Sequence, residues 1–296
     1  MRKRPTTIIC ALGAVLVLAT ACGQARAGTA LPKGDDAAAY VGGKFEAAMN
    51  KLQDVIDNQR DVTTSSDNYF RFDEKYAHSL ITAARTGSPE SRVVHNRSQK
   101  NPDDVLDTFT PADGPVEYMY LGPAFKAAAP TSWVSMAKSE VGQQLKCGFA
   151  GVYTACKMAD AVAMSANADK KTVKGAKVGR DGKTELTADV TFDAFLTRPV
   201  EQLPESIKSQ ITPELRKAVI PTKILLNPDG TLDQIVMEAK FEGSGHKVEL
   251  RYDFRFTGKA SAQDLPKLPD PAQVTALPDR AAKDALWAKI AEARGN

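Results

Sequence analysis

The stretch VELRYDFRF, from Val248 to Phe256, decides the fold class of this chain. Its residues alternate between apolar side chains and the charged side chains of glutamate, arginine and aspartate. Successive side chains of a β-strand point to opposite faces of the sheet, so the pattern predicts an antiparallel strand with one buried and one solvated face. The rest of the fold must cover that buried face.

Further alternating stretches lie on both sides of the turn sequence NPDG at residues 227–230, in which proline presets the turn and glycine accepts a positive φ angle. Their apolar positions are Ile224 and Leu226 before the turn, Ile235, Met237, Ala239 and Phe241 after it, and Leu186, Ala188, Val190 and Phe192 earlier in the chain. Shorter strand-like pieces are predicted at residues 69–72, 92–95, 105–109, 116–121, 133–136 and 172–178.

Apolar residues at helical spacing predict an amphipathic helix from Val41 to Arg60. A short helix is predicted from Met158 to Asn167, and helical pieces interrupted by prolines between Leu203 and Val219. A final helix is predicted from its N-cap Asp279 to Arg294. Since strands follow one another without the alternating βαβ order of a parallel sheet, the fold class is α+β.

The first 21 residues have the composition of a secretory signal peptide. A basic start at residues 2–4 precedes an apolar run from Ile8 to Ala19, and small residues end the segment. A helix of about 12 residues, at about 1.5 Å each, is too short to cross a hydrocarbon core of about 30 Å. We therefore expect this segment to direct export and then to be removed.

Cys22 follows the small residues Ala19-Thr20-Ala21, as in the lipobox of bacterial lipoproteins, whose cysteine receives a diacylglyceryl group on its sulfur. Residues 22–39 are mostly small or polar, which is typical of a flexible tether. The sequence thus predicts a lipid anchor on the extracytoplasmic face of the cell membrane. The alternative is an ordinary signal peptide cut after Ala27, and Ala19 stands where the lipobox prefers leucine.

With Cys10 in the signal segment and Cys22 in the lipobox, Cys147 and Cys156 are left to form a disulfide. Such a bond would stabilise the fold by about 2–3 kcal/mol on the chain-entropy estimate. A metal site is the alternative, but two cysteines without a nearby histidine are a weak ligand set.

Charge and motifs indicate no catalytic, metal, cofactor or nucleic-acid site. The chain has 39 Lys and Arg and 36 Asp and Glu, and removal of the three basic residues at positions 2–4 leaves equal numbers, without a basic cluster. His78, His95 and His246 belong to no catalytic or zinc-binding motif. Neither a glycine-rich phosphate loop nor a calcium-loop spacing of carboxylates occurs.

The region from Val116 to Leu277 resembles the LppX/LprG-type envelope lipoproteins of actinobacteria, which have a LolA-like half-barrel. The likeness rests on four features in order: VEYMYLG with TSWVSMAK at 116–138, KKTVKGAKVGRDGKTELTADVTFDAFL at 170–196, IPTKILLNPDGTLDQIVMEAKF at 220–241, and VELRYDFRFTGKASAQDLPKLPDPAQV at 248–274. Residues 61–115, the segment from Cys147 to Cys156 and the tail after Pro278 depart from the family pattern.

The resemblance implies a strongly curved antiparallel sheet wrapped over the N-terminal helix and short inserted helices, as one domain at residues 40–277 with a helical tail at 278–296. It also implies no enzyme, and an apolar cavity for the acyl chains of a lipid or lipidated glycan. The candidate cavity residues are Leu186, Val190, Phe192, Ile235, Met237, Phe241, Leu250, Tyr252 and Phe254, facing Phe45, Met49, Leu52 and Ile56. From the alternation alone, a filled core of the same residues is the alternative, since an inward apolar stripe is common to both.

The leading hypothesis is a non-enzymatic lipoprotein that binds an amphiphile and carries it across the envelope. The second is an anchored interaction or sensor module of the same fold with a filled core, paired with a membrane-protein partner. A solute-binding lipoprotein of an importer would need two βαβ-rich lobes, and a hydrolase would need a nucleophile and a base that this chain does not offer.

Overall fold

The computed structural model describes residues 39, 40, 42–44, 46–48, 51, 61–138, 147 and 150–295. The chain divides into two compact units, Met1–Leu31 and Pro32–Asn296, and every described residue belongs to the second. Cys22 and the predicted signal peptide and tether up to residue 38 lie outside the described residues.

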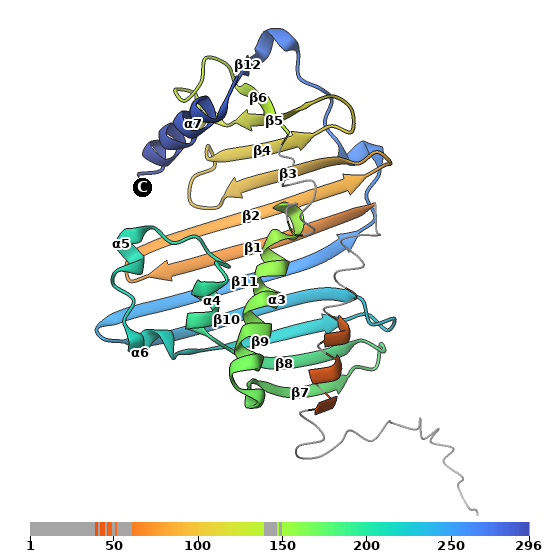
Figure 1. Cartoon of the computed structure of the whole chain (residues 1–296), viewed down its shortest axis with the longest axis vertical. Coiled ribbons are helices and arrows are strands. Elements are labelled where there is room, and N and C mark those ends of the chain that lie inside the picture. The colour runs from red at the N-terminus through yellow and green to blue at the C-terminus, as the bar shows by residue number, and fades with distance from the viewer. Residues whose placement is uncertain are drawn as a thin grey trace, which may run out of the picture. The chain divides into compact units, whose positions relative to one another are not determined.

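One open, curved sheet of twelve strands forms the described part of the fold (Figure 1). The strands are β1 Val62–Phe72, β2 Lys75–Thr86, β3 Ser91–Ser98, β4 Val105–Thr110, β5 Val116–Leu121, β6 Trp133–Ala137, β7 Val173–Val178, β8 Thr184–Thr191, β9 Val219–Leu226, β10 Leu232–Gly243, β11 His246–Gly258 and β12 Val274–Ala276. Their spatial order is β12-β6-β5-β4-β3-β2-β1-β11-β10-β9-β8-β7, so β12 and β7 are the two edges. The pairs are antiparallel except β12 with β6, which is parallel.

The helices are short except for α3 and α7. They are α3 Ala150–Ala168, α4 Phe192–Thr197, α5 Glu205–Lys208, α6 Pro213–Arg216 and α7 Arg280–Ala293, with 3₁₀ turns η1 Pro123–Phe125, η2 Lys170–Thr172, η3 Ala262–Asp264 and η4 Pro271–Gln273. Figure 1 shows α3 crossing one face of the sheet, which we call the inner face, and α7 near the β5–β6 end. The other side of the sheet is its outer face.

The strand predicted from the alternation at residues 248–256 is confirmed by β11. Val248, Leu250, Tyr252 and Phe254 are buried on the inner face, and Arg251 and Arg255 are exposed on the outer face. This strand lies between β1 and β10 in the middle of the sheet, where both of its edges are hydrogen-bonded.

The region from residue 61 to 115 contains four strands, of 11, 12, 8 and 6 residues, where the sequence predicted short pieces at 69–72, 92–95 and 105–109. The inward positions of β1 include Thr64, Ser66 and Asn68, which are buried although they are polar. Because half of the buried face is hydrophilic, the alternation of apolar and polar side chains that reveals β11 is missing from β1. The predicted strands were therefore too short for β1 and β3, and β2 was missed, whereas the strand predicted at 105–109 is confirmed by β4.

The helices differ from the predictions in three places. α3 begins at Ala150, eight residues before the predicted Met158. Phe192, predicted as the last inward residue of a strand, is the first residue of α4, and Thr191 caps that helix by accepting a hydrogen bond from the Ala194 amide at 3.1 Å. Of the predicted helix from Val41 to Arg60, only residues 42–44, 46–48 and 51 are described, each helical, so the helix as a whole stays a prediction.

The inner face carries two separate apolar clusters. The large cluster lies between the sheet, α3 and α4, and its fully buried members include Phe70, Met158, Leu186, Phe192, Phe195, Ile235, Met237, Leu250 and Phe254. The end cluster lies under β4, β5 and β6 and consists of Leu106, Met119, Leu121, Phe125, Ala128, Val134, Met136, Leu286 and Ile290. The last two residues belong to α7, whose N-cap Asp279 accepts a hydrogen bond from the Ala282 amide at 2.9 Å, as predicted.

Candidate functional site

The predicted cavity residues that the structure describes all face the same side of the sheet. Eight of them are buried in the large cluster, and Phe241 packs against it with part of its ring exposed. The eight are Leu186, Val190, Phe192, Ile235, Met237, Leu250, Tyr252 and Phe254. The other four candidates, Phe45, Met49, Leu52 and Ile56, lie outside the described residues. The described residues that the sequence predicted thus belong to one contiguous apolar cluster.

Aromatic rings fill much of the space between α4 and the sheet. The Phe192 ring lies 6.5 Å from Phe70, 5.9 Å from Phe195 and 5.0 Å from Phe241, measured between ring centroids. Phe195 in turn meets Tyr252 edge-on at 5.2 Å. Contacts of this kind add to the stabilisation from burial. This part of the inner face is therefore a packed core.

Tyr252 brings a polar group into this interior. Its hydroxyl donates a hydrogen bond to Oε2 of Glu201, at 2.5 Å, from the loop that joins α4 to α5. Burial raises the pKa of Glu201 above its ordinary value, against the hydrogen bonds from Tyr252 and the Gln202 amide. Burial, together with the negative charge of Glu201, raises the pKa of Tyr252 as well. The pair satisfies the one polar atom of a fully buried tyrosine.

Between the two apolar clusters, the inner face is partly exposed and polar. We call this region the inner strip; it comprises Ser66 and Asn68 of β1, Ser79 and Ile81 of β2, and Val94 and Asn96 of β3. The register places Asn68 opposite Ser79, Ser66 opposite Ile81, and Ile81 opposite Asn96. The β2 and β3 members are partly exposed, whereas Ser66 and Asn68 are buried.

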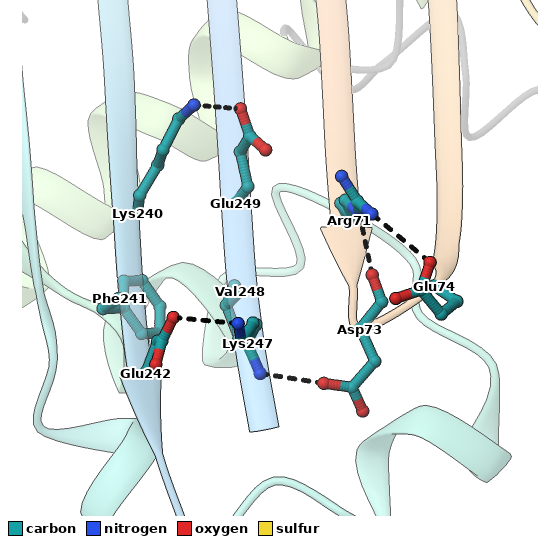
Figure 2. Close-up of a pocket in the computed structure, with 9 residues that line it drawn as sticks. All are labelled: Arg71, Asp73, Glu74, Lys240, Phe241, Glu242, Lys247, Val248 and Glu249. Carbon is teal, nitrogen blue, oxygen red and sulfur yellow. Dashed lines mark hydrogen bonds and ion pairs between the residues drawn. The ribbon is translucent and has the colours of Figure 1, made fainter. Parts of the chain in front are cut away.

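A shallow groove of about 410 Å³ opens where the β1–β2 and β10–β11 turns meet. Figure 2 shows its lining residues, Arg71, Asp73, Glu74, Lys240, Phe241, Glu242, Lys247, Val248 and Glu249. Its charged side chains neutralise one another: Lys240 lies 2.7 Å from Glu249, and Lys247 lies 3.5 Å from Glu242. With three cations against four anions, the groove has little net charge to attract an ionic ligand.

Asp73 joins the two turns at this groove. Its carboxylate accepts hydrogen bonds from the Lys247 amide and from His246 Nδ1, both at 2.8 Å, and these bonds lower its pKa. Asp73 has a φ of 53°, a left-handed conformation that aspartate tolerates better than most residues. Asp73 thus joins the β1–β2 turn to the β10–β11 turn, and the groove lies around this contact.

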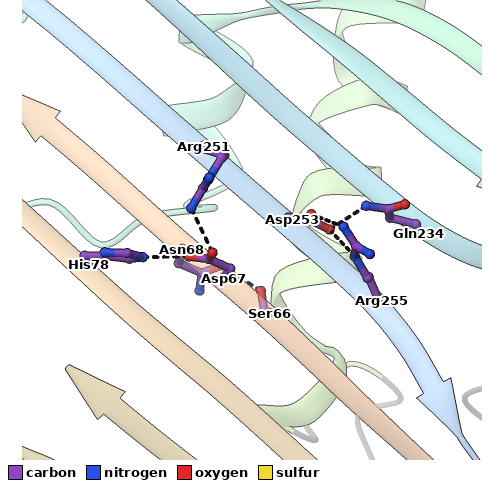
Figure 3. A network of polar contacts seen from close by, with 8 residues as sticks. All are labelled: Ser66, Asp67, Asn68, His78, Gln234, Arg251, Asp253 and Arg255. Carbon is purple, nitrogen blue, oxygen red and sulfur yellow. Dashed lines mark hydrogen bonds and ion pairs between the residues drawn. The ribbon is translucent and has the colours of Figure 1, made fainter. Parts of the chain in front are cut away.

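The outer face of the central strands carries a network of charges (Figure 3). Asp67 of β1 lies 2.8 Å from His78 of β2 and 2.8 Å from Arg251 of β11. On β11, burial raises the pKa of Asp253, but hydrogen bonds from Arg255 and Gln234 hold it below its ordinary value. These contacts tie neighbouring strands together on the solvated side of the sheet.

All three histidines pair with an aspartate, which the sequence did not reveal. His95 lies 3.0 Å from Asp107, as His78 and His246 pair with Asp67 and Asp73. Each partner comes from a neighbouring strand or turn, so only strand register could have predicted the pairs. Among the described residues, no group of three or more His, Cys, Asp or Glu is placed to hold a metal ion.

The disulfide between Cys147 and Cys156 is confirmed, with a Cα–Cα distance of 6.0 Å. It joins Cys147 to Cys156, a buried residue of α3. Within the described part of the chain, no helix has the length and apolar character needed to cross a membrane.

Comparison with solved structures gives matches of low sequence identity and low TM-score. No protein-family model matches the chain, and no curated protein sequence does. The Mycobacterium tuberculosis lipoprotein LppX aligns with a TM-score of 0.32 and 8% identity, over 78% of this chain and 99% of that protein. A DUF1329 family protein from Desulfovibrio piger aligns with a TM-score of 0.23 and 9% identity, over 76% of this chain and 95% of that protein. At such low TM-scores, these alignments carry no argument about ligand or activity.

Proposed function

We propose that this chain is a non-enzymatic extracytoplasmic lipoprotein that binds a lipid or lipidated glycan against the inner face of its sheet and carries it across the envelope. The observation that carries the proposal is the unequal chemistry of the two faces. The inner face of β8 to β11 is apolar, while the outer face carries the charges of Asp67, Arg251 and Asp253. Because α3 and α4 cover this apolar face, an acyl chain would enter by displacing them, and the partly exposed strip beside it would contact the polar end of the amphiphile.

The sequence also supports a location at the extracytoplasmic face of the membrane. A basic start, a short apolar run and small residues precede Cys22, which would carry the anchor. Two acyl chains hold a protein at a membrane far more firmly than the marginal grip of one. Anchored in this way, the sheet would work beside the bilayer that supplies its ligand.

Replacement of Cys22 by serine tests the anchor. The variant is expected to appear in the medium or to remain uncleaved, because serine cannot receive the thioether-linked diacylglyceryl group. Cell fractionation with immunoblotting measures this, and Cys10→Ser, a change inside the predicted signal segment, is the control. Unchanged membrane association of the mature Cys22→Ser protein would rule out the lipobox.

Extraction of bound lipid tests the ligand. The protein is purified from its membrane, washed free of loosely bound lipid and extracted with organic solvent, and the extract is examined by mass spectrometry. A lipid that recurs at a fixed ratio in independent preparations is the expected result. A protein that repeatedly carries none after purification, and takes up none from vesicles, would exclude a carrier.

A second candidate is an anchored interaction or sensor module whose core is filled. The observation that favours it is the packing of Phe192 against three other aromatic rings in the place where the family resemblance implied a cavity. The two candidates differ in the lipid extraction described above. A filled core that binds a membrane-protein partner would give no lipid and would be captured instead by crosslinking in membranes.

A further inference from the structure

The inner strip presents hydrogen-bonding side chains in a regular array. Strand register places Asn68, Ser79 and Ser98 directly opposite one another on three successive strands, and Asn96 is two residues from Ser98 on the same face of β3. Adjacent strands are about 4.8 Å apart, and directly opposed Cβ atoms about 5 Å. Neighbouring members of the array are therefore close enough for one polar headgroup to contact more than one of them.

Asn68 is a buried polar side chain whose donor has no partner among the described residues. The residue is only 8% exposed. Its Oδ1 accepts a hydrogen bond from the Ser66 hydroxyl at 2.6 Å, but its Nδ2 donates to none of the residues that the structure describes. An amide donor that makes no hydrogen bond within the described part of the protein is available to a ligand acceptor. Figure 3 shows Ser66 and Asn68 together on β1.

The neighbours of Asn68 also have hydrogen-bonding capacity to spare. Within the described part of the chain, neither the Ser79 hydroxyl nor the Asn96 side-chain amide makes a side-chain hydrogen bond, and both residues are partly exposed. Amides and hydroxyls can each donate and accept, so they suit hydroxyl groups, which do the same.

The strip contains no charge. Between the ends of β2 at Lys75 and Arg85, the inward-facing residues of β1 and β2 are all neutral, and so are Val94, Asn96 and Ser98 of β3. A phosphate or sulfate headgroup calls for arginine, lysine or a helix N-terminus. The chemistry of the strip therefore favours an uncharged headgroup that carries several hydroxyls.

We infer that the inner strip binds the uncharged, hydroxyl-rich headgroup of the amphiphile, with Nδ2 of Asn68 donating to a headgroup oxygen and Ser79 and Asn96 contacting adjacent hydroxyls. This inference rests on the proposed function, which supplies the apolar part of the ligand. It adds the headgroup class, a sugar or polyol in place of a phosphate, and the residues that select it.

Two probes with the same twelve-carbon chain test the selection: dodecyl maltoside and dodecyl phosphate, each below its micelle concentration. Native mass spectrometry of the purified full chain measures Kd for both. Maltoside is expected to bind at least about threefold more tightly. Asn68→Leu keeps the branched shape of the side chain and removes its hydrogen-bonding atoms, so it should weaken maltoside binding about three- to tenfold and leave dodecyl phosphate unchanged.

Thr82→Val is the matched control, because Thr82 is exposed on the outer face of β2, opposite Ser65. Ser79→Ala, at a partly exposed position, provides the same test with less risk to folding. Equal binding of both probes, with no effect of either inner-strip variant, would overturn the headgroup assignment and leave lipid binding intact. Preference for dodecyl phosphate would also overturn it. Failure of both probes to bind would overturn the proposed function itself.

Discussion

Replacement of Phe192 by alanine is expected to lower the free energy of unfolding by about 4 kcal/mol. Phe192 is 0% exposed and sits at the start of α4, where it meets the rings of Phe70, Phe195 and Phe241. Alanine is a better helix former than phenylalanine, and the Thr191 cap is left in place. The whole effect should therefore come from lost packing.

The size of the effect follows from the burial and the ring contacts. Truncation of a buried phenylalanine to alanine costs about 3–5 kcal/mol, and the cost is largest where the surroundings cannot collapse into the space. Each aromatic pair adds about 0.5–1.5 kcal/mol to simple burial. Three ring neighbours and no exposure place Phe192 in the upper half of that range.

Urea unfolding of the full chain, followed by circular dichroism, measures the change. Phe256→Ala is the matched control, because Phe256 is only partly buried and meets one ring, Phe254, at 5.2 Å. A cost of about 1–2 kcal/mol is expected there. A Phe192→Ala cost no larger than that of Phe256→Ala would refute the packed core and show that the Phe192 ring lines open space.

Three further predictions concern the disulfide and two carboxylates. Cys147→Ser should lower the free energy of unfolding by about 2.5 kcal/mol; reductant should bring the parent protein to the same stability, and a variant that still responds to reductant would contradict this. Glu201→Gln should raise the thermal midpoint near neutral pH but not below pH 4.5. Burial raises the pKa of Glu201 in the folded protein, so stability is lost as the pH rises through that pKa, and glutamine carries no charge to bury. An equal effect at both pH values would exclude the buried carboxylate as the cause. Asp73→Asn should lower the thermal midpoint near neutral pH, and this difference should shrink below pH 3.8. The pKa of Asp73 is lowered in the folded protein, so the stability that its carboxylate contributes is lost as the pH falls through that pKa. A difference that does not depend on pH would contradict this prediction.

Local pattern was sufficient for β8, β10 and β11, whose inward residues are apolar, and for the end of β9 at Ile224 and Leu226, whereas the start of β9 has the polar Thr222 on its buried face. It was insufficient for β1, whose inward face contains Thr64, Ser66 and Asn68. Two of these polar residues, Ser66 and Asn68, also belong to the inner strip. The sequence pattern predicted neither the full length of β1 nor the inner strip. Both depend on polar side chains that are buried in the middle of the sheet, and a local pattern does not predict such burial.

The candidate site residues also divide into those that local alternation predicts and those whose contacts depend on tertiary structure. Leu250 and Tyr252 could be chosen from alternation, and they are buried as expected. The bond from Tyr252 to Glu201 joins residues 51 positions apart, and the sequence shows neither the loop geometry nor the burial that produces it. The pairing of His246 with Asp73 spans 173 positions and depends on two turns meeting.

By itself, the sequence determined the predicted export and anchoring features, the cysteine pair, the fold class and the apolar face of the sheet. These properties depend on composition and on periods of two to four residues, which a single strand or helix displays. Tertiary structure alone decided strand order, the separation of two apolar clusters and the array of Asn68, Ser79 and Asn96 between them. Register between strands sets which side chains are neighbours, and register is fixed by long-range packing that no local pattern contains.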